Sequence, residues 1–281
     1  SGHTREARAE SHLARARPNP RRSSVNQPDT ERPPPSRDWD SLFPIQDSAL
    51  ACQFVRETSG DTVILSFSGG KDSLAAWAAL RRAGFTRIIP VFHYLVPGLE
   101  CVEEHLRHVE ETLQTRIIRL PHPFLTWCLR EGAFQPPVEA ALLATLDYPF
   151  RDYDDWTDRV RDWAGCPDAW VALGTTRNDS VNRRLTFRQQ GCARPAQRKL
   201  FPIGDWTKQQ IIDAIRELGV KLPPHYHVWG RSFDGTDLFF LEGLRRQWPR
   251  DYARVMEWFP LNVLEYRRAE IAAAHRREAR A

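Results

Sequence analysis

Residues 68–73, with the sequence SGGKDS, contain the side chains and the backbone freedom that a phosphate-binding turn requires. Consecutive glycines permit positive φ angles and let a ligand approach the backbone closely. Where such a turn opens a helix, the first amide groups lack intrahelical partners and attract anions. A lysine adds positive charge, an aspartate can hold Mg²⁺ or cap the helix, and serine hydroxyls add hydrogen bonds. We therefore predict a pyrophosphate site formed by Ser68, Gly69, Gly70, Lys71, Asp72 and Ser73, with Asp72 as the metal ligand.

The segments around this turn determine the expected fold. Residues 62–67 (TVILSF) are apolar and β-branched, which is typical of a buried parallel strand. Further strands are expected at residues 87–93, 115–120 and 169–173, and helices at 48–58, 73–83, 101–113, 138–146, 155–164 and 208–218. Strands alternating with helices predict an α/β fold, a doubly wound, mostly parallel sheet with a helical C-terminal extension.

We predict three regions along the chain. Residues 1–38 form a disordered basic leader, residues 39–230 a nucleotide-binding α/β domain, and residues 231–281 a helical extension packed on it. Residues 1–37 contain eight arginines and four acidic residues, so they carry the whole net charge of +4 and the remainder is neutral. The leader is either a docking arm for nucleic acid or a partner, or a solvated tail, and bulk charge does not indicate a nucleic-acid protein.

Two further groups of residues follow the ends of other strands. Phe92 and His93 end the second strand and are candidates for contact with adenine and ribose, with strand packing as the alternative. Residues 177–199 contain seven basic residues and one acidic residue, which predicts a basic loop for a phosphate, a sulfate or a nucleic-acid backbone, or a solvated loop. The candidates beside the fourth strand are Gly174, Thr176, Arg177, Arg183 and Arg184, and Arg177 and Arg183 are expected to be catalytic with Lys71 and Asp72.

The cysteines and one acidic run have competing interpretations. Five cysteines without a CxxC pair predict free thiols in a reducing cytoplasm, although an iron–sulfur site remains an alternative. Cys101, Cys166 and Cys192 are each possible sulfur carriers. Asp152, Asp154 and Asp155 could hold a second Mg²⁺ or provide a helix N-cap at Asp154 or Asp155. No apolar run approaches the roughly 20 residues that span a bilayer, so a membrane protein is not expected.

A strand, SGGxDS and a helix together resemble the PP-loop ATP pyrophosphatase superfamily, the adenine nucleotide α-hydrolases. The resemblance implies a HUP-type α/β fold that binds Mg-ATP and cleaves it to AMP and pyrophosphate, adenylating an acceptor for sulfur or nitrogen transfer. The GxxxxGK[ST] spacing is absent, so kinase-type transfer is not indicated. Residues 174–184, 200–207 and 222–226 also resemble the phosphoadenosine phosphosulfate (PAPS) reductase-like branch.

The chain departs from that branch at two points. Thr176 stands at the arginine position of its GxRxxES segment and Asp179 at the glutamate position, so Arg177, Arg183 or Arg184 would supply the phosphate contacts. No cysteine follows Cys192, although sulfonucleotide reductases need a C-terminal thiol. PAPS reduction with an external thiol and a non-catalytic nucleotide-sensing module are therefore alternatives to the ATP pyrophosphatase.

The end of the chain, from residue 230 to residue 260, resembles PAPS reductase-like proteins of phages and mobile elements. This resemblance implies nucleic acid or a ParB-like protein as possible partners. The sequence does not indicate an oligomeric state.

Overall fold

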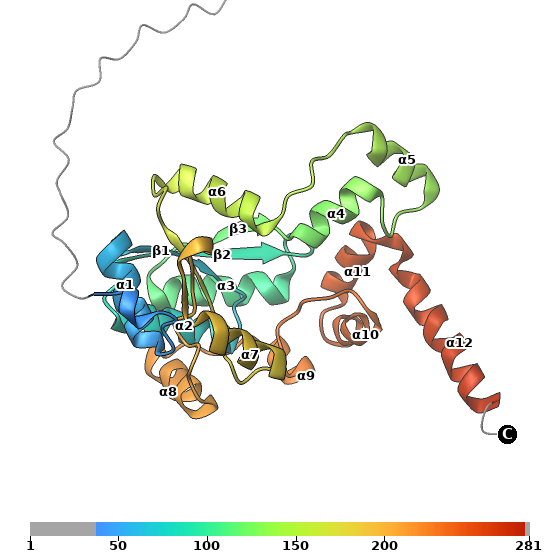
Figure 1. Ribbon diagram of the computed structural model, residues 1–281. Helices are drawn as coiled ribbons and strands as arrows, with labels where there is room; N and C mark the ends of the chain where they lie inside the picture. Colours follow the sequence, from blue (N-terminus) through green and yellow to red (C-terminus); the bar gives the residue numbers. More distant parts are fainter. Residues whose placement is uncertain (1–37, 279–281) are drawn as a thin grey trace, which may run out of the picture. The chain divides into compact units, whose positions relative to one another are not determined.

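The computed structural model describes residues 38–278 (Figure 1), so the predicted basic leader lies almost wholly outside the described residues. Six strands form one sheet in the order β3-β2-β1-β4-β6-β5. The strands are β1 (Thr62–Ser66), β2 (Arg87–Tyr94), β3 (Ile118–Pro121), β4 (Trp170–Leu173), β5 (Ala193–Arg194) and β6 (Lys199–Leu200). All neighbouring pairs are parallel except β5 with β6, which confirms the prediction of a doubly wound, mostly parallel α/β sheet.

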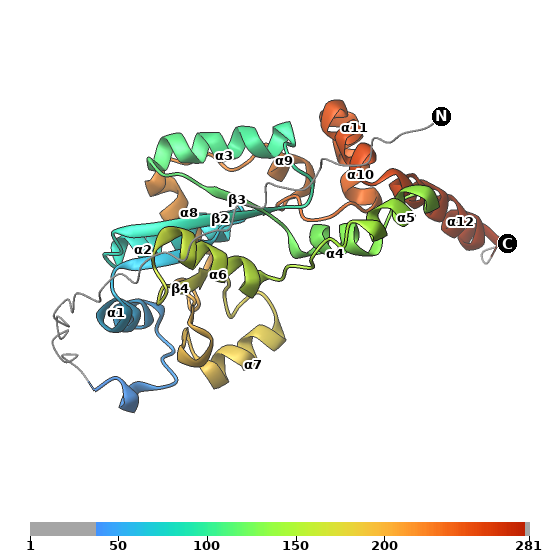
Figure 2. The same cartoon turned by 90° about the horizontal axis from the view of Figure 1, so that it is seen from above.

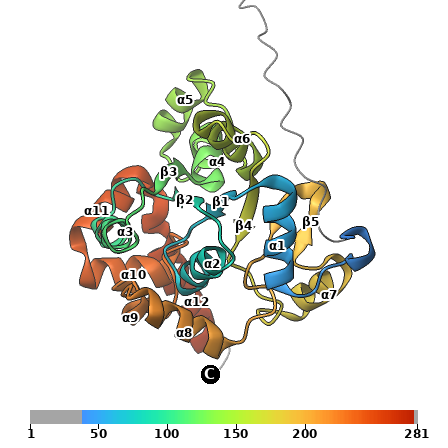
Figure 3. The same ribbon diagram turned by 90° about the vertical axis from the view of Figure 1, so that its left-hand side faces the viewer.

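Helices cover both faces of this sheet, because successive side chains of a strand point to opposite faces. Val63 and Leu65 of β1 belong to the large hydrophobic core, whereas Ile64 packs in a smaller cluster with Val160. Figures 2 and 3 show α2 and α3 on one side of the sheet and α6 on the other. The first six helices are α1 (Ser48–Ser59), α2 (Lys71–Arg82), α3 (Glu100–Leu113), α4 (Pro123–Glu131), α5 (Pro137–Thr145) and α6 (Tyr153–Ala164).

The later helices are α7 (Val181–Gln190), α8 (Lys208–Leu218), α9 (His225–Trp229), α10 (Leu238–Gln247), α11 (Pro249–Trp258) and α12 (Leu264–Glu278). The helix α7 shows that the prediction of a basic loop over residues 177–199 was wrong. Ser180 caps this helix by accepting the N–H of Arg183 at 3.2 Å, and Phe187 anchors it in the core. A single apolar anchor gives no helical periodicity, which is why the sequence pattern did not reveal the helix.

Several element boundaries also differ from the prediction by a few residues, β3 and α2 among them. The third strand begins at Ile118 rather than Thr115, and α2 begins at Lys71 rather than Ser73. The earlier start of α2 places Lys71 and Asp72 in the first helical turn, where their backbone amides have no intrahelical partner.

A buried carboxylate on α11 forms hydrogen bonds to the start of α3 and so connects the C-terminal helices to it. Asp251 of α11 is 1% exposed and accepts the N–H groups of Glu100 at 2.7 Å and Cys101 at 2.9 Å. It therefore caps the first turn of α3 across about 150 positions of sequence. Among the described residues, no helix has both the length and the apolar character that crossing a membrane requires.

Candidate functional site

The glycine turn between β1 and α2 has the conformation that its sequence predicts. Gly69 has a φ of +71°, a value that favours glycine. Its carbonyl oxygen lies 2.8 Å from Nε2 of His105, a buried residue of α3. Only a protonated Nε2 can donate to this carbonyl, which fixes the tautomer of a neutral His105. Burial lowers the pKa of His105, which favours that neutral form. Sequence reasoning missed His105, because a histidine within an amphipathic helix carries no local signal of such a contact.

The amides of the turn are arranged for an anion. Within the described chain, the N–H groups of Asp72 and Ser73 at the start of α2 have no hydrogen-bond partner. The N–H of Lys71 donates to Oη of Tyr226 at 3.2 Å. The hydroxyl of Ser73 donates to the Gly70 carbonyl at 2.9 Å, which holds the turn against the helix. Free amides at the positive end of a 12-residue helix favour the binding of an anion such as phosphate.

A cavity of about 560 Å³ opens in front of the turn. The predicted site residues that line it are Ser68, Lys71, Asp72, Phe92, His93, Gly174 and Arg183. The structure thus brings together side chains from the ends of β1, β2 and β4. Other lining residues, Tyr153, Asp179, Tyr226, Arg231, Ser232 and Asp234, were not among the sequence candidates. Four of these six belong to the segment after α8, where the residue types alone gave no indication of a site.

The segment after β4 is packed directly against α2. A Cβ atom on Gly174 would lie 2.7 Å from the carbonyl oxygen of Asp72, so only glycine permits this approach. Asp179 accepts the Thr176 N–H at 3.0 Å and its hydroxyl at 2.9 Å, and pairs with Arg183 at 2.5 Å. Burial opposes ionisation of Asp179, but these hydrogen bonds outweigh it and hold its pKa below the usual value.

The structure separates the predicted residues of this segment. Among residues 38–278, Arg183 lines the cavity, whereas Thr176, Arg177 and Arg184 do not belong to its lining. Thr176 is 3% exposed, and the backbone N–H of Arg177 donates to the Gly204 carbonyl at 2.9 Å. Through these contacts, Thr176 and the backbone of Arg177 stabilise the loop that follows β4.

The charged side chains in the cavity are paired with each other. Nζ of Lys71 lies 2.6 Å from a carboxylate oxygen of Asp72, Arg183 pairs with Asp179, and Arg231 pairs with Asp234. Oxygen ligands from one or two carboxylates, completed by phosphate oxygens, suit Mg²⁺. Within the described part of the chain, no group of three or more acidic, histidine or cysteine side chains could hold a metal by itself. Asp72 therefore fits Mg²⁺ that arrives with a polyphosphate.

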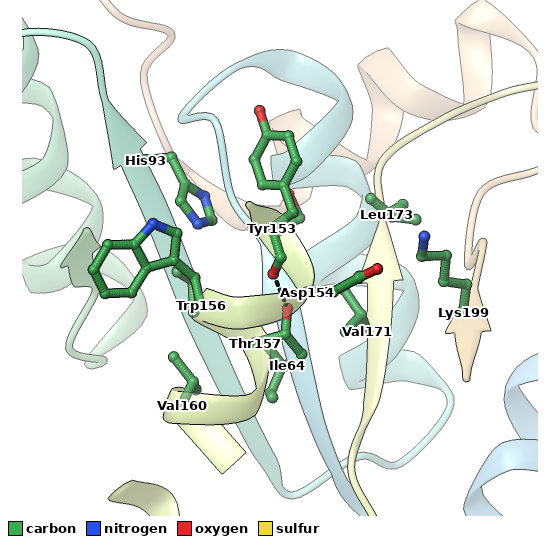
Figure 4. Close-up of a pocket in the computed structure, with 12 residues that line it drawn as sticks. Ile64, His93, Tyr153, Asp154, Trp156, Thr157, Val160, Val171, Leu173 and Lys199 are labelled. Carbon is green, nitrogen blue, oxygen red and sulfur yellow. Dashed lines mark hydrogen bonds between the residues drawn. The ribbon is translucent and has the colours of Figure 1, made fainter. Parts of the chain in front are cut away.

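A second cavity of about 310 Å³ adjoins the first and lies between the sheet and α6 (Figure 4). Its walls include Ile64, Val91, Trp156, Val160 and Val171. The residues Ser66, His93 and Tyr153 line both cavities, so the two spaces meet there. An apolar slot of this kind, joined to a polar cavity, suits a flat heterocyclic ring.

His93 lies at this junction as a neutral residue. Burial lowers its pKa to about 4, and the nearby imidazole of His122 adds to the effect. Its Nε2 has no hydrogen-bond partner among the described residues. A neutral histidine with an unpaired ring nitrogen can donate to or accept from a ligand.

The acidic run before α6 forms a helix cap. Asp152 is the N-cap and accepts the N–H of Asp155 at 2.8 Å, while the Asp155 carboxylate accepts the N–H of Asp152 at 3.0 Å. The predicted cap at Asp154 or Asp155 was therefore placed too late, because the reciprocal capping box begins at Asp152. Two carboxylates of this run are engaged with backbone amides.

The five cysteines are free thiols. Burial raises the pKa of Cys128 and of Cys192 to about 12, and it also raises the pKa values of Cys52, Cys101 and Cys166. A thiol must lose its proton to act as a nucleophile or a metal ligand. These environments disfavour both roles at neutral pH.

No family model matches this sequence. Two of the similar solved structures are an NH3-dependent NAD synthetase from Campylobacter jejuni, in complex with the nitrate ion, and the U34-tRNA thiolase NcsA from Methanococcus maripaludis, with its [4Fe-4S] cluster. The synthetase has 17% identity and a TM-score of 0.38, with 82% of this chain and 96% of that chain covered. The thiolase has 15% identity and a TM-score of 0.37, with 76% and 78% covered. Both scores are low, so a function must be inferred from the site itself.

Proposed function

We propose that this protein is a PP-loop enzyme that binds Mg-ATP and cleaves it to AMP and pyrophosphate. One observation carries the proposal: free amides at the start of α2, beside Lys71, face a cavity of about 560 Å³ that continues into an apolar slot. In this arrangement the β- and γ-phosphates contact the turn, and the base enters the smaller cavity next to Val91 and Trp156.

The reaction requires charge stabilisation more than acid–base chemistry. An acceptor oxygen attacks the α-phosphorus, the bond to the bridging oxygen of the β-phosphate breaks, and pyrophosphate leaves with that electron pair. Lys71 and Arg183, which line the cavity, and the turn amides would stabilise the negative charge on the leaving group. Mg²⁺, held by Asp72, supplies charge neutralisation when bound. A sulfur or nitrogen nucleophile then displaces AMP from the adenylated acceptor.

The acceptor in this proposal is nucleic acid. The exposed arginines Arg184 and Arg188 of α7 follow Arg183 on the helix and are available for a phosphate backbone. Arg177, the other predicted catalytic arginine, does not line the cavity among the described residues, so this proposal gives it no direct contact with the nucleotide. A ParB-like protein is a proposed partner that would present the acceptor.

Incubation with α-labelled ATP and Mg²⁺, with and without DNA or tRNA, tests this function. AMP and pyrophosphate are the expected products, and K71A should reduce their formation about 10²-fold, the usual cost of removing one charge-stabilising donor. K208A, which removes an exposed lysine at the start of α8, is the matched control and should retain activity.

Two other results would replace the proposal. Sulfite release from PAPS in the presence of thioredoxin would identify a sulfonucleotide reductase that uses an external thiol. None of the described cysteines lines the cavity, so such an enzyme would use an external thiol. Tight ATP binding without turnover under every condition would identify a nucleotide-sensing module.

A further inference from the structure

Tyr153 and His122 form a hydrogen-bonded pair at the junction of the two cavities. Nδ1 of His122 lies 3.0 Å from the backbone nitrogen of Phe124, and its Nε2 lies 2.6 Å from Oη of Tyr153. His122 is the N-cap of α4, and Tyr153 is the first residue of α6. Figure 4 shows the rings of Tyr153 and His93 side by side at the cavity.

The contact between His122 and the Phe124 backbone determines which atom donates in the hydrogen bond between His122 and Tyr153. A backbone N–H can only donate, so Nδ1 of His122 accepts and carries no proton. A neutral imidazole then has its proton on Nε2 and donates it to the Tyr153 oxygen. Burial lowers the pKa of His122, with the Asp234 charge opposing, so the neutral ring is favoured. Tyr153 therefore accepts the hydrogen bond from His122 and does not donate its own hydroxyl proton to it. That proton remains available for a hydrogen bond to a ligand.

The tyrosine ring is also held in place. It packs edge-on against His93, with centroids 5.1 Å apart, and edge-on against His122, with centroids 5.5 Å apart. Burial raises the pKa of Tyr153, so its hydroxyl keeps its proton at neutral pH. An oriented donor held by three contacts needs little reorganisation when a charged ligand binds.

The position of the Tyr153 hydroxyl between the two cavities indicates which part of a bound nucleotide it would contact. With phosphates at the turn and the base in the apolar slot, the junction lined by Ser66, His93 and Tyr153 lies beside the α-phosphate. We propose that Tyr153 is a catalytic residue that donates its hydroxyl proton in a hydrogen bond to an α-phosphate oxygen, and that His122 is its positioning residue. This inference rests on the proposed function, because it places a nucleotide across both cavities.

The test compares two conservative variants in AMP formation from ATP. Y153F keeps the ring and removes the donor, and it should lower kcat/KM by about 10- to 100-fold, as expected for a hydrogen bond to a charged group. H122N keeps an N-cap for α4 but removes Nε2–H, and it should lower kcat about 3- to 10-fold. Y148F, in the loop before α6 and outside both cavity linings, is the control and should match the wild type.

The double variant separates positioning from structural support. If His122 acts through Tyr153, H122N should cause no further loss in the Y153F background. Additive losses would overturn the positioning role, and a Y153F enzyme with wild-type kcat/KM would overturn the proposal. If the wild type does not cleave ATP, the proposed function fails, but binding of a fluorescent ATP analogue still decides this inference. A Kd that rises about 10-fold or more in Y153F supports the contact, and an unchanged Kd overturns it.

Discussion

His225 is predicted to make the stability of the fold depend on pH. This residue of α9 is 4% exposed, and neither ring nitrogen has a hydrogen-bond partner of normal geometry among the described residues. Burial lowers its pKa from 6.5 to about 4, and the nearby His105 adds to the effect, while the Cys101 backbone opposes it. The folded protein therefore holds the ring in its neutral form at pH values above about 4.

The sign and the size of the effect follow from the two pKa values. Between pH 6.5 and pH 4 the unfolded chain binds the proton and the folded protein does not, so acid favours unfolding. The contribution is complete above pH 6.5 and is lost as the pH falls toward 4. Each pKa unit corresponds to about 1.4 kcal/mol, so His225 should cost about 2 kcal/mol of unfolding free energy between pH 7.5 and pH 5.

The assay is urea unfolding followed by tryptophan fluorescence at pH 7.5 and pH 5. H225L has similar volume and no titrating group, so it should lose about 2 kcal/mol less than the wild type over this interval. H227Q, at an exposed histidine on the same helix, is the control and should retain the wild-type dependence. Equal losses in H225L and the wild type would refute the reasoning, since the remaining titrating groups are common to both proteins.

Three further predictions follow from close contacts. G174A should lower the unfolding free energy by about 1–3 kcal/mol and weaken ATP binding, because its Cβ would meet the Asp72 carbonyl at 2.7 Å; urea unfolding and nucleotide titration measure both. D251A should cost about 2–4 kcal/mol in the same unfolding assay, since two N–H groups of α3 lose their acceptor, and D251N should cost less. At pH 8 a disulfide reagent should modify Cys192 at least 10-fold more slowly in the folded protein than in urea, because burial raises its pKa to about 12; equal rates would contradict this.

The sequence predicted the central part of the fold because the relevant signals are local. A β-branched apolar run, a pair of glycines and an amphipathic helix follow one another between residues 62 and 83, and each is specified by its own neighbours. The same logic predicted the sheet. It failed for α7, where an arginine-rich helix depends on one buried residue, Phe187, and on a cap at Ser180. Neither signal distinguishes a helix from a polar loop.

The candidate site could be predicted only in part. The residues at the ends of β1 and β2 are identified by their position after a strand, and Lys71, Phe92 and His93 do line the cavity. Residues from the segment after α8 reach the site only through the tertiary fold. Tyr226 accepts the Lys71 N–H although the two residues are 155 positions apart in the sequence. A local sequence pattern carries no information about a contact between residues so far apart.

Glycine at position 69 permits the conformation of the glycine turn but does not enforce it, because a glycine has greater freedom in the unfolded chain as well. Enforcement comes from groups that lie far away in sequence: His105 bonds the Gly69 carbonyl, and the chain at Gly174 packs on the first turn of α2. Asp251 caps α3, the helix that carries His105, so α11 supports the turn without touching it. The residues proposed to bind phosphate can therefore be found from a short motif, whereas the precision with which they are held depends on residues far away in the sequence.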